Sequence, residues 1–204
     1  MCEDVPSPID LRLMRDAREW EMSAMAKRPW RIEFFDRFAA ELAVKPPQVT
    51  RVLELGSGPG FLAEHLLRAN PDITLTMLDF SGAMHELAKV RLGELGTRAQ
   101  FVERTFKESH WVEGLGQFEA VVINQAVHEL RHKRHASALH TQVRSVLSPE
   151  GVYLVCDHFV GEGGMTNESL YMSVVEQRLA LQQAGFSSVR QVMLKGGLVL
   201  HRAA

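Results

Sequence analysis

Three features of the sequence have residue types and spacing that could do chemistry. The first is VLELGSGPGF (52–61), in which glycines recur at every second position of the loop. Glycine permits sharp turns and close approach of a ligand to the backbone, and a following helix start favours polar or anionic groups. The second feature is Asp79 in MLDFSGAM, and the third is a pair of histidines, His128 in VHELRH and His158 beside Asp157. Histidine titrates in the range that suits acid–base catalysis.

The spacing of the glycines separates possible classes of ligand. A dinucleotide fingerprint, G-x-G-x-x-G, would need its third glycine where Phe61 stands. No G-K-[ST] follows the run, so a phosphate-binding P-loop is excluded. A nicotinamide oxidoreductase is therefore disfavoured, and failure to bind NAD would remove it.

The histidines also form a rival motif. The segment from His128 to His132, HELRH, reads H-E-x-x-H, the signature of zinc peptidases. In that signature two histidines on one helix face bind zinc and the glutamate activates a water molecule. The motif needs a continuous helix, whereas here it follows directly after an expected buried strand. A zinc hydrolase is the less favoured alternative.

These residues lie in a chain that alternates short β-rich runs with helical stretches. Repeated βα units predict a parallel sheet with right-handed crossovers. Gly196-Gly197 favours a tight hairpin, which makes the last strand antiparallel. The fold class we expect is α/β, a doubly wound Rossmann-like sheet of about seven strands plus N-terminal helices. Strands are expected at 51–55, 73–78, 100–102, 120–123, 152–156, 189–193 and 198–201, and helices at 61–69, 84–95, 133–147 and 170–184.

The N-terminal part has a different pattern. Residues 8–44 show helical spacing, and Pro46-Pro47 ends it. We therefore expect a helical cap over 1–47 and an α/β domain over 48–204. Either the cap's aromatic residues form an apolar lid over the ligand cleft or they pack onto the domain; they are Trp20, Trp30, Phe34 and Phe35.

Composition excludes several classes of protein. The chain has 204 residues, 46% of them hydrophobic, which is too many for a disordered chain. Lys and Arg number 23 against 25 Asp and Glu, which argues against binding nucleic acid by phosphate neutralisation. No apolar run approaches the ~18 residues of a membrane span, and the first residues lack signal-peptide character. Two cysteines suit a reducing compartment, so we expect a cytoplasmic protein.

The motifs resemble those of the class I S-adenosylmethionine-dependent methyltransferases, over roughly residues 50–204. ELGSGPG (54–60) looks like the first motif of that family, and Asp79 matches the acid that ends its second strand. The resemblance implies that backbone around the glycines holds the methionine part of S-adenosylmethionine. It also implies that Asp79 accepts the ribose hydroxyls and that Phe80 and Met84 flank the adenine.

Later motifs extend the resemblance. In FVERTFKE, Thr105 stands where the family usually has an acid, and Thr105 or the backbone of Phe106 would meet the adenine edge. FEAVVINQAVHEL resembles the fourth strand and its turn, with Asn124 and Gln125 at the strand tip. The implied cofactor-binding residues are Glu54, Gly56, Ser57, Gly58, Gly60, Asp79, Phe80, Met84, Thr105, Phe106, Asn124 and Gln125.

The resemblance implies an enzyme that transfers a methyl group from S-adenosylmethionine to an O, N or C atom of a small-molecule acceptor. His128 and His158 are the candidate catalytic bases, and no metal is expected. NQAV after the fourth strand lacks the N/D-P-P-Y/F pattern of enzymes that methylate base amino groups. A small-molecule partner is therefore expected, with neither nucleic acid nor membrane. The alternative is a non-catalytic S-adenosylmethionine-binding protein, from which no methyl group would reach an acceptor.

Overall fold

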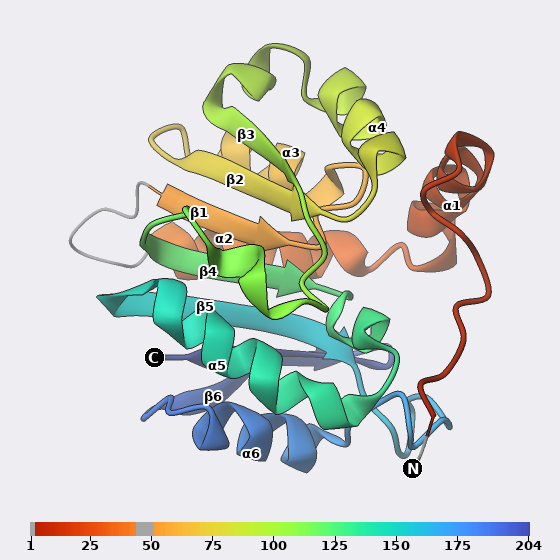
Figure 1. Ribbon diagram of the computed structural model, residues 1–204, viewed down its shortest axis with the longest axis vertical. Helices are drawn as coiled ribbons and strands as arrows, with labels where there is room; N and C mark the ends of the chain where they lie inside the picture. Colours follow the sequence, from red (N-terminus) through yellow and green to blue (C-terminus); the bar gives the residue numbers. More distant parts are fainter. Residues whose placement is uncertain (1–2, 44–50) are drawn as a thin grey trace. The chain divides into compact units, whose positions relative to one another are not determined.

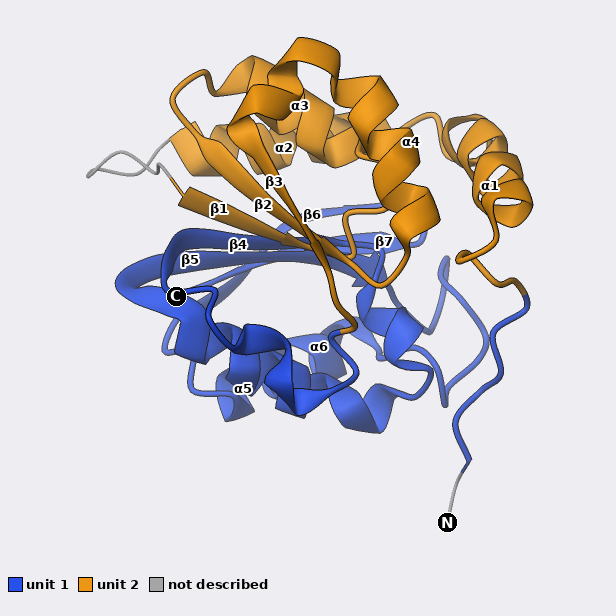
Figure 2. Ribbon diagram, turned by 45° about the horizontal axis from the view of Figure 1, so that its top comes forward, with its two compact units in different colours: residues 1–8, 106–204 blue, residues 9–105 orange. Residues whose placement is uncertain are grey.

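The structure of the protein, a computed structural model, describes residues 3–43 and 51–204. The chain falls into two compact units (Figures 1 and 2): residues 9–105 form one, and residues 1–8 with 106–204 form the other. The expected boundary between residues 47 and 48 lies outside the described residues.

The unit of residues 9–105 carries three parallel strands in the order β3-β2-β1. Leu55 at the end of β1 is in register with Leu78, and Asp79 at the end of β2 is in register with Glu103. The carboxyl ends of these strands therefore lie at one edge. The elements are α1 (Met14–Lys27), α2 (Arg31–Ala43), β1 (Arg51–Leu55), α3 (Phe61–Ala69), β2 (Thr74–Asp79), α4 (Gly82–Leu92), the 3₁₀ helix η1 (Gly93–Arg98) and β3 (Ala99–Glu103).

The N-terminal helices contribute to the core of this unit. Phe34, Phe35 and Phe38 of α2 are almost fully buried, and α2 packs against α3. Of the four aromatic residues expected to pack or to form a lid, Phe34 and Phe35 therefore pack in the core. Burying such large side chains contributes about 1.5–3 kcal/mol each.

The other unit carries the remaining four strands, in the order β4-β5-β7-β6. β4 and β5 are parallel, whereas β7 is antiparallel to both β5 and β6. The elements are η2 (Ser109–Val112), β4 (Phe118–Asn124), η3 (Val127–Leu130), η4 (Lys133–His135), α5 (Ala136–Val146), β5 (Leu147–His158), α6 (Val174–Gln183), β6 (Val189–Lys195) and β7 (Leu198–Ala203).

A two-residue turn makes the last strand antiparallel, as predicted. Lys195 pairs with Leu198, and Gly196 and Gly197 between them have φ of 55° and 78°. Positive φ at both central residues is the requirement of a type I′ hairpin, which glycine meets without strain. All seven expected strands are present, and with them the expected mixed α/β architecture.

Several element boundaries differ from the prediction. The first helix begins at Met14 rather than residue 8, because the Asp10 side chain accepts a hydrogen bond from the Arg12 amide and forms a turn. The helix predicted over 84–95 ends at Leu92, where Gly93 has a φ of 50°.

In the other unit, two helices start later than predicted, and two strands start earlier, β4 at Phe118 instead of 120 and β5. The helix predicted from residue 133 begins at Ala136, after a 3₁₀ turn. The helix predicted from residue 170 begins at Val174, where Ser173 and Glu176 form a capping box. β5 starts at Leu147, five residues before the predicted 152.

Candidate active site

The glycine loop joins β1 to α3 through three left-handed residues. Gly56, Gly58 and Gly60 have φ of 65°, 53° and 80°, a region that other residues enter only with strain. The Gly56 amide donates to the Leu78 carbonyl oxygen at 2.8 Å, which fixes the loop to the end of β2. A Cβ on Gly58 would meet nothing within 4 Å, so there is open space beside the loop.

Asp79 is oriented by two backbone amides. Its Oδ2 accepts from the Gly58 amide at 2.8 Å, and its Oδ1 accepts from the Ser81 amide at 3.0 Å. The residue is buried. These two bonds fix the direction of the carboxylate. The sequence placed Asp79 at the strand end, and the structure joins it directly to the glycine loop.

Two buried polar atoms at the tip of β1 lack partners. Among the described residues, Glu54 Oε2 and Ser57 Oγ have no hydrogen-bond partner. Burial, with a smaller effect from the charge of Asp79, raises the pKa of Glu54 well above its usual value. Burial thus favours the protonated form of the Glu54 carboxyl. Because an unpaired buried polar atom costs about 1–3 kcal/mol, a polar ligand at this tip would be stabilised.

The adenine-flanking candidates lie around the start of α4. Ser81 caps this helix, since its Oγ accepts from the Met84 amide at 3.1 Å. Met84 is buried, and the Arg12 guanidinium lies 4.8 Å from the centre of the Phe80 ring. Thr105 follows β3 in the same unit. All of these candidates, namely Glu54, the glycine loop, Asp79, Phe80, Met84 and Thr105, belong to this unit.

The remaining predicted residues belong to the other unit. Asn124 ends β4, and its Oδ1 is buried without a partner among the described residues. Gln125 has a φ of 55° and donates its amide to the Cys156 carbonyl oxygen at 2.7 Å. A non-glycine residue with positive φ is uncommon and marks a constrained turn. Phe106 is also buried in this unit.

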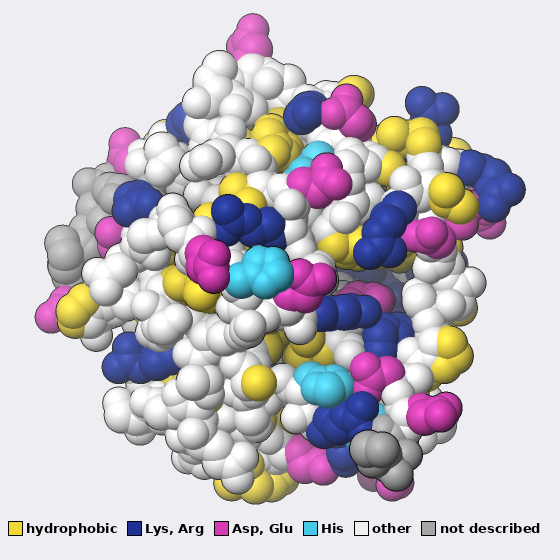
Figure 3. Space-filling view, in the orientation of Figure 1, with side chains coloured by type: hydrophobic (Ala, Val, Ile, Leu, Met, Phe, Trp, Pro, Cys, Tyr) yellow, Lys and Arg dark blue, Asp and Glu magenta, His cyan; other side chains and the backbone are white. Residues whose placement is uncertain are grey.

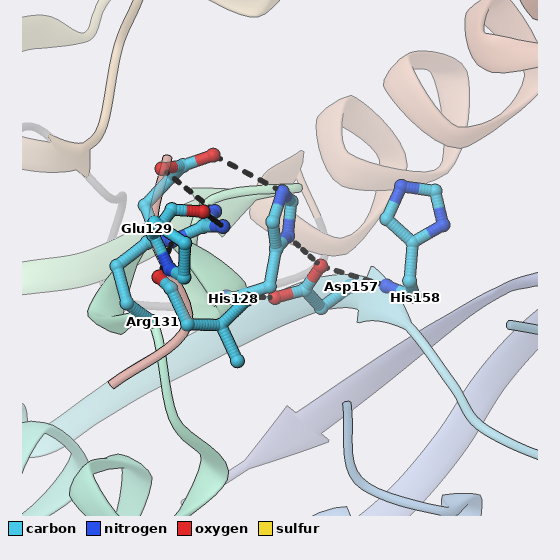
Figure 4. Close-up of polar contacts among 7 residues, drawn as sticks. His128, Glu129, Arg131, Asp157 and His158 are labelled. Carbon is cyan, nitrogen blue, oxygen red and sulfur yellow. Dashed lines mark hydrogen bonds and ion pairs between the residues drawn. The ribbon is translucent and has the colours of Figure 1, made fainter. Parts of the chain in front are cut away.

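His128 lies between two carboxylates (Figure 4). Its Nδ1 is 2.7 Å from Asp157 Oδ1, and its Nε2 is 3.4 Å from Glu129 Oε1. The Asp157 carboxylate also accepts from the backbone amides of His128, at 2.8 Å, and His158, at 2.7 Å. Asp157 therefore fixes the position of both histidines that the sequence suggested as bases.

The two carboxylates determine the charge of His128. Burial opposes protonation, but Asp157 and then Glu129 raise the pKa of His128 to about 10. Burial disfavours the charged form of Asp157 as well, which raises the pKa of this carboxyl, but the neighbouring His128 has the opposite effect and holds the pKa below its usual value. At neutral pH the group is Asp157 carboxylate, His128 imidazolium and Glu129 carboxylate. Charge-assisted hydrogen bonds of this kind are the strong ones.

An arginine that the sequence did not single out completes this group. Arg131 has a φ of 68°, and its Nη1 lies 3.5 Å from Glu129 Oε2. Its Nε and Nη2 donate to the carbonyl oxygens of Val5, at 2.9 Å, and Pro6, at 2.7 Å. Arg131 thus binds the N-terminal segment beside Glu129. No local pattern signals a contact across 126 positions.

Aromatic rings surround the two histidines. The His128 and His158 rings are 5.3 Å apart between centroids, and Tyr171 lies 5.6 Å from each. Gln177 donates through Nε2 to the His158 carbonyl oxygen at 2.8 Å. The two histidines and Tyr171 form a ring cluster next to the Asp157 carboxylate.

A family comparison identifies the part of the chain that carries the glycine loop. Residues 52–151 match the model of a family described as a methyltransferase domain. This match covers 100 of the 204 residues, just under half of the chain. The resemblance to class I S-adenosylmethionine-dependent methyltransferases is thereby confirmed.

Solved structures show that the methyltransferase fold extends over nearly the whole chain. An O-methyltransferase family protein from Burkholderia thailandensis has a TM-score of 0.73 at 18% sequence identity, and the match covers 93% of this chain and 59% of that protein. Human N-acetylserotonin methyltransferase in complex with SAM has a TM-score of 0.72 at 17% sequence identity, and the match covers 95% of this chain and 56% of that protein. The DhpI–SAH complex has a TM-score of 0.70 at 19% sequence identity, and the match covers 95% of both chains.

These comparisons confirm the expected Rossmann-like fold and define its extent. The chain spans less than two thirds of the length of the first two neighbours, whereas its match with DhpI covers 95% of both chains. No curated protein matches the sequence. None of the helices in the described part of the chain has the length and apolar character to cross a membrane.

The zinc-peptidase motif lacks the helix it requires. η3 ends at Leu130, Arg131 is left-handed with a φ of 68°, and His132 is extended. His128 and His132 therefore do not share one face of a helix. Within residues 3–43 and 51–204, no cluster of three or more His, Cys, Asp or Glu side chains could hold a metal ion. This geometry argues against a zinc hydrolase.

Proposed function

We propose that this methyltransferase transfers a methyl group from S-adenosylmethionine to a small-molecule acceptor. The observation that carries the proposal is the joined arrangement of glycine loop and Asp79, with the unpaired Glu54 Oε2 and Ser57 Oγ beside it. Such a site offers backbone amides, an oriented carboxylate and two polar atoms that need a partner. A ligand with amine, carboxylate and hydroxyl groups suits this set.

Each predicted binding residue has a role in the proposal. The loop from Gly56 to Gly60, with Glu54 and Ser57, would hold the methionine part, and Asp79 would accept the ribose hydroxyls. Phe80 and Met84 would flank the adenine, with Thr105 and Phe106 at its edge. Asn124 and Gln125 would close over the methionine end. When bound, S-adenosylmethionine supplies an electrophilic methyl group on a sulfonium sulfur.

The chain's own contribution to methyl transfer is alignment and proton control. Holding two reactants in an attack geometry can lower a barrier by ~7–11 kcal/mol. A hydroxyl or neutral amine acceptor must also lose a proton, for which His128 and His158 are the candidate bases. Because its pKa is about 10, His128 holds a proton at neutral pH and can accept one only after losing it. His158, oriented through its backbone by Asp157, is the alternative base.

The proposed partner is a small molecule rather than nucleic acid. Formal charge is −2, and on the face shown in Figure 3 acidic and basic side chains are intermingled. Counterion release from nucleic acid depends on a concentrated basic surface. Together with two cysteines in the whole sequence, these features support a cytoplasmic enzyme acting on a metabolite. The Burkholderia neighbour is named an O-methyltransferase family protein, which makes hydroxyl compounds the first acceptors to test.

Calorimetric titration with S-adenosylhomocysteine is the first test, with NAD and zinc as controls. We expect micromolar binding of S-adenosylhomocysteine alone. Radiolabelled S-adenosylmethionine is then incubated with hydroxyl and amine compounds, and transfer of label to one of them completes the test. No binding would overturn the proposal. Binding without transfer to any acceptor would favour the non-catalytic alternative.

A further inference from the structure

An arginine of α4 joins the glycine loop to the helices around it. Arg91 donates through Nε to the Pro59 carbonyl oxygen at 2.8 Å. Its Nη2 donates to Glu21 Oε1 of α1 at 2.5 Å, and its Nη1 lies 3.8 Å from Glu64 Oε2 of α3. The guanidinium also stacks on Phe61, 3.8 Å from the ring centre. One side chain thus contacts the loop and both helices beside it.

The Pro59 carbonyl is a sensitive point of the loop. Pro59 lies between Gly58 and Gly60, whose φ values are 53° and 80°. Glycine has the widest backbone freedom of any residue, and the Arg91 contact adds to the loop's own hydrogen bond, from the Gly60 amide to the Ser57 carbonyl oxygen at 3.2 Å, in holding this peptide in one orientation. The Gly58 amide donates to Asp79, and a rotation of this segment would move that amide.

The charges around Arg91 hold the contact in place. Arg91 and Glu21 are each about one-fifth exposed, with side-chain values of 22% and 21%. Partial burial strengthens an ion pair relative to one in open solvent. Phe61 supplies a flat ring at the position where a dinucleotide fingerprint would have glycine. A guanidinium placed on such a ring gains a cation–π contact.

The N-terminal segment contacts the same region a second time. Ser81 Oγ, at the start of α4, donates to the Leu11 carbonyl oxygen at 2.6 Å. Arg12 lies over Phe80, and α1 packs beside α4 (Figure 1). Residues 11–27 therefore contact the proposed adenine side through Leu11 and Arg12. They contact the glycine loop indirectly, because Glu21 binds the Arg91 side chain that binds Pro59.

We propose that Arg91 is a positioning residue that holds the glycine loop in its cofactor-binding form and links that form to α1. This inference rests on the proposed function, because the loop's ligand is taken to be S-adenosylmethionine. Arg91 does not touch the reacting atoms; it acts through Pro59 on the Gly58 amide and hence on Asp79. Loosening α1 by loss of Glu21 would then weaken cofactor binding at a distance.

The test compares Arg91→Met with Lys89→Met. Both changes remove a cation from α4, but Lys89 forms an ion pair with the exposed Glu86 at 2.7 Å and lies 5.6 Å from the centre of the Phe101 ring. We expect Arg91→Met to weaken S-adenosylhomocysteine binding about tenfold, the scale of one charge-assisted hydrogen bond, and Lys89→Met to leave it unchanged. Glu21→Gln should give a smaller loss, and Arg91→Lys should restore part of the affinity.

A second readout separates positioning from general destabilisation. In ¹⁵N spectra of the unliganded protein, the Gly58 and Gly60 amide signals should move in Arg91→Met and Glu21→Gln and stay in place in Lys89→Met. A variant that is only less stable would bind with lower stoichiometry but unchanged Kd. If Arg91→Met does not fold, Arg91→Lys and Glu21→Gln carry the test.

The outcomes distinguish this inference from the proposed function. Wild-type protein that binds no S-adenosylhomocysteine overturns both. Wild-type binding together with unchanged Kd and unchanged glycine signals in the Arg91 and Glu21 variants overturns the role of Arg91 alone. A graded loss of affinity, with moved glycine signals, establishes it.

Discussion

Asp79 and His128 show how a side chain's chemistry depends on its bonds to the backbone and to other side chains. Asp79 accepts from the Gly58 and Ser81 amides, so loop and carboxylate are one unit. His128 contacts Glu129 of its own turn and Asp157 of β5, and Asp157 has the larger effect on its charge. Each arrangement leads to a measurable expectation.

Asp79→Asn should weaken S-adenosylhomocysteine binding by about 1.5–3 kcal/mol, the typical value of hydrogen bonds to a charged group. The amide loses the negative charge and replaces one acceptor oxygen with a donor. Calorimetry of the variant against Asp72→Asn, which changes an exposed acid of the same unit, measures the effect. Equal affinity for wild type and Asp79→Asn would contradict the assignment.

The charge of His128 should make stability fall at alkaline pH. Its pKa in the folded protein is about 10, above the ordinary value of about 6.5. The folded state therefore binds the proton more tightly than the unfolded state does. This contribution is fully present below pH ~6.5 and is lost as pH rises towards ~10. Urea unfolding between pH 6 and 10, with NMR titration of the His128 ring, tests the expectation.

Asp157→Asn is the matched variant for the His128 titration. Removing the carboxylate should lower the pKa of His128, because Asp157 contributes the largest effect that raises it. The alkaline loss of stability should then shift to lower pH. A His128 signal that titrates near pH 6.5 in the wild type would refute the charged arrangement.

At the scale of elements, Gly60 determines how closely α3 and α4 pack. A Cβ at Gly60 would lie 3.1 Å from Ala88 Cβ of α4, and the residue has a φ of 80°. Both the helix contact and the backbone therefore require glycine at this position. Two glycines of the loop thus differ in their roles, since a Cβ on Gly58 would enter open space, whereas a Cβ on Gly60 would crowd against Ala88 of α4.

Gly60→Ala should lower the free energy of unfolding by about 1–3 kcal/mol from backbone strain, with a further loss from crowding against Ala88. Gly114→Ala is the control, since Gly114 has a φ of 73° and a Cβ there would meet nothing within 4 Å. Chemical denaturation of both variants separates strain from crowding. Equal losses would show that α3 and α4 tolerate the added methyl group.

At the scale of the whole molecule, a ligand that binds only the folded chain raises its stability. S-adenosylhomocysteine at 100 times its Kd should add about 2.7 kcal/mol. For a chain of this size, that corresponds to roughly 5–10 °C in Tm. Thermal unfolding with and without the ligand measures the shift, and NAD at the same concentration should give none. A shift with NAD but not with S-adenosylhomocysteine would reverse the choice of cofactor.

The sequence by itself determined the features that depend on local backbone preference. Glycine spacing predicted the turn at 56–60, and the alternation of β-rich and helical runs predicted seven strands. The Gly196-Gly197 pair predicted the final antiparallel hairpin. Such features form within a few residues, so neighbouring residue types are enough to identify them.

Tertiary structure decided the features that join distant parts of the chain. The placement of β7 beside β5 is one of these. Others are the pairing of His128 with Asp157, 29 positions apart, and the contact of Arg91 with Pro59, 32 positions apart. Arg131 is buried where it binds the N-terminal segment, 126 positions away in the sequence. Burial and charge at these sites depend on which segments pack together, and local residue types do not encode that packing.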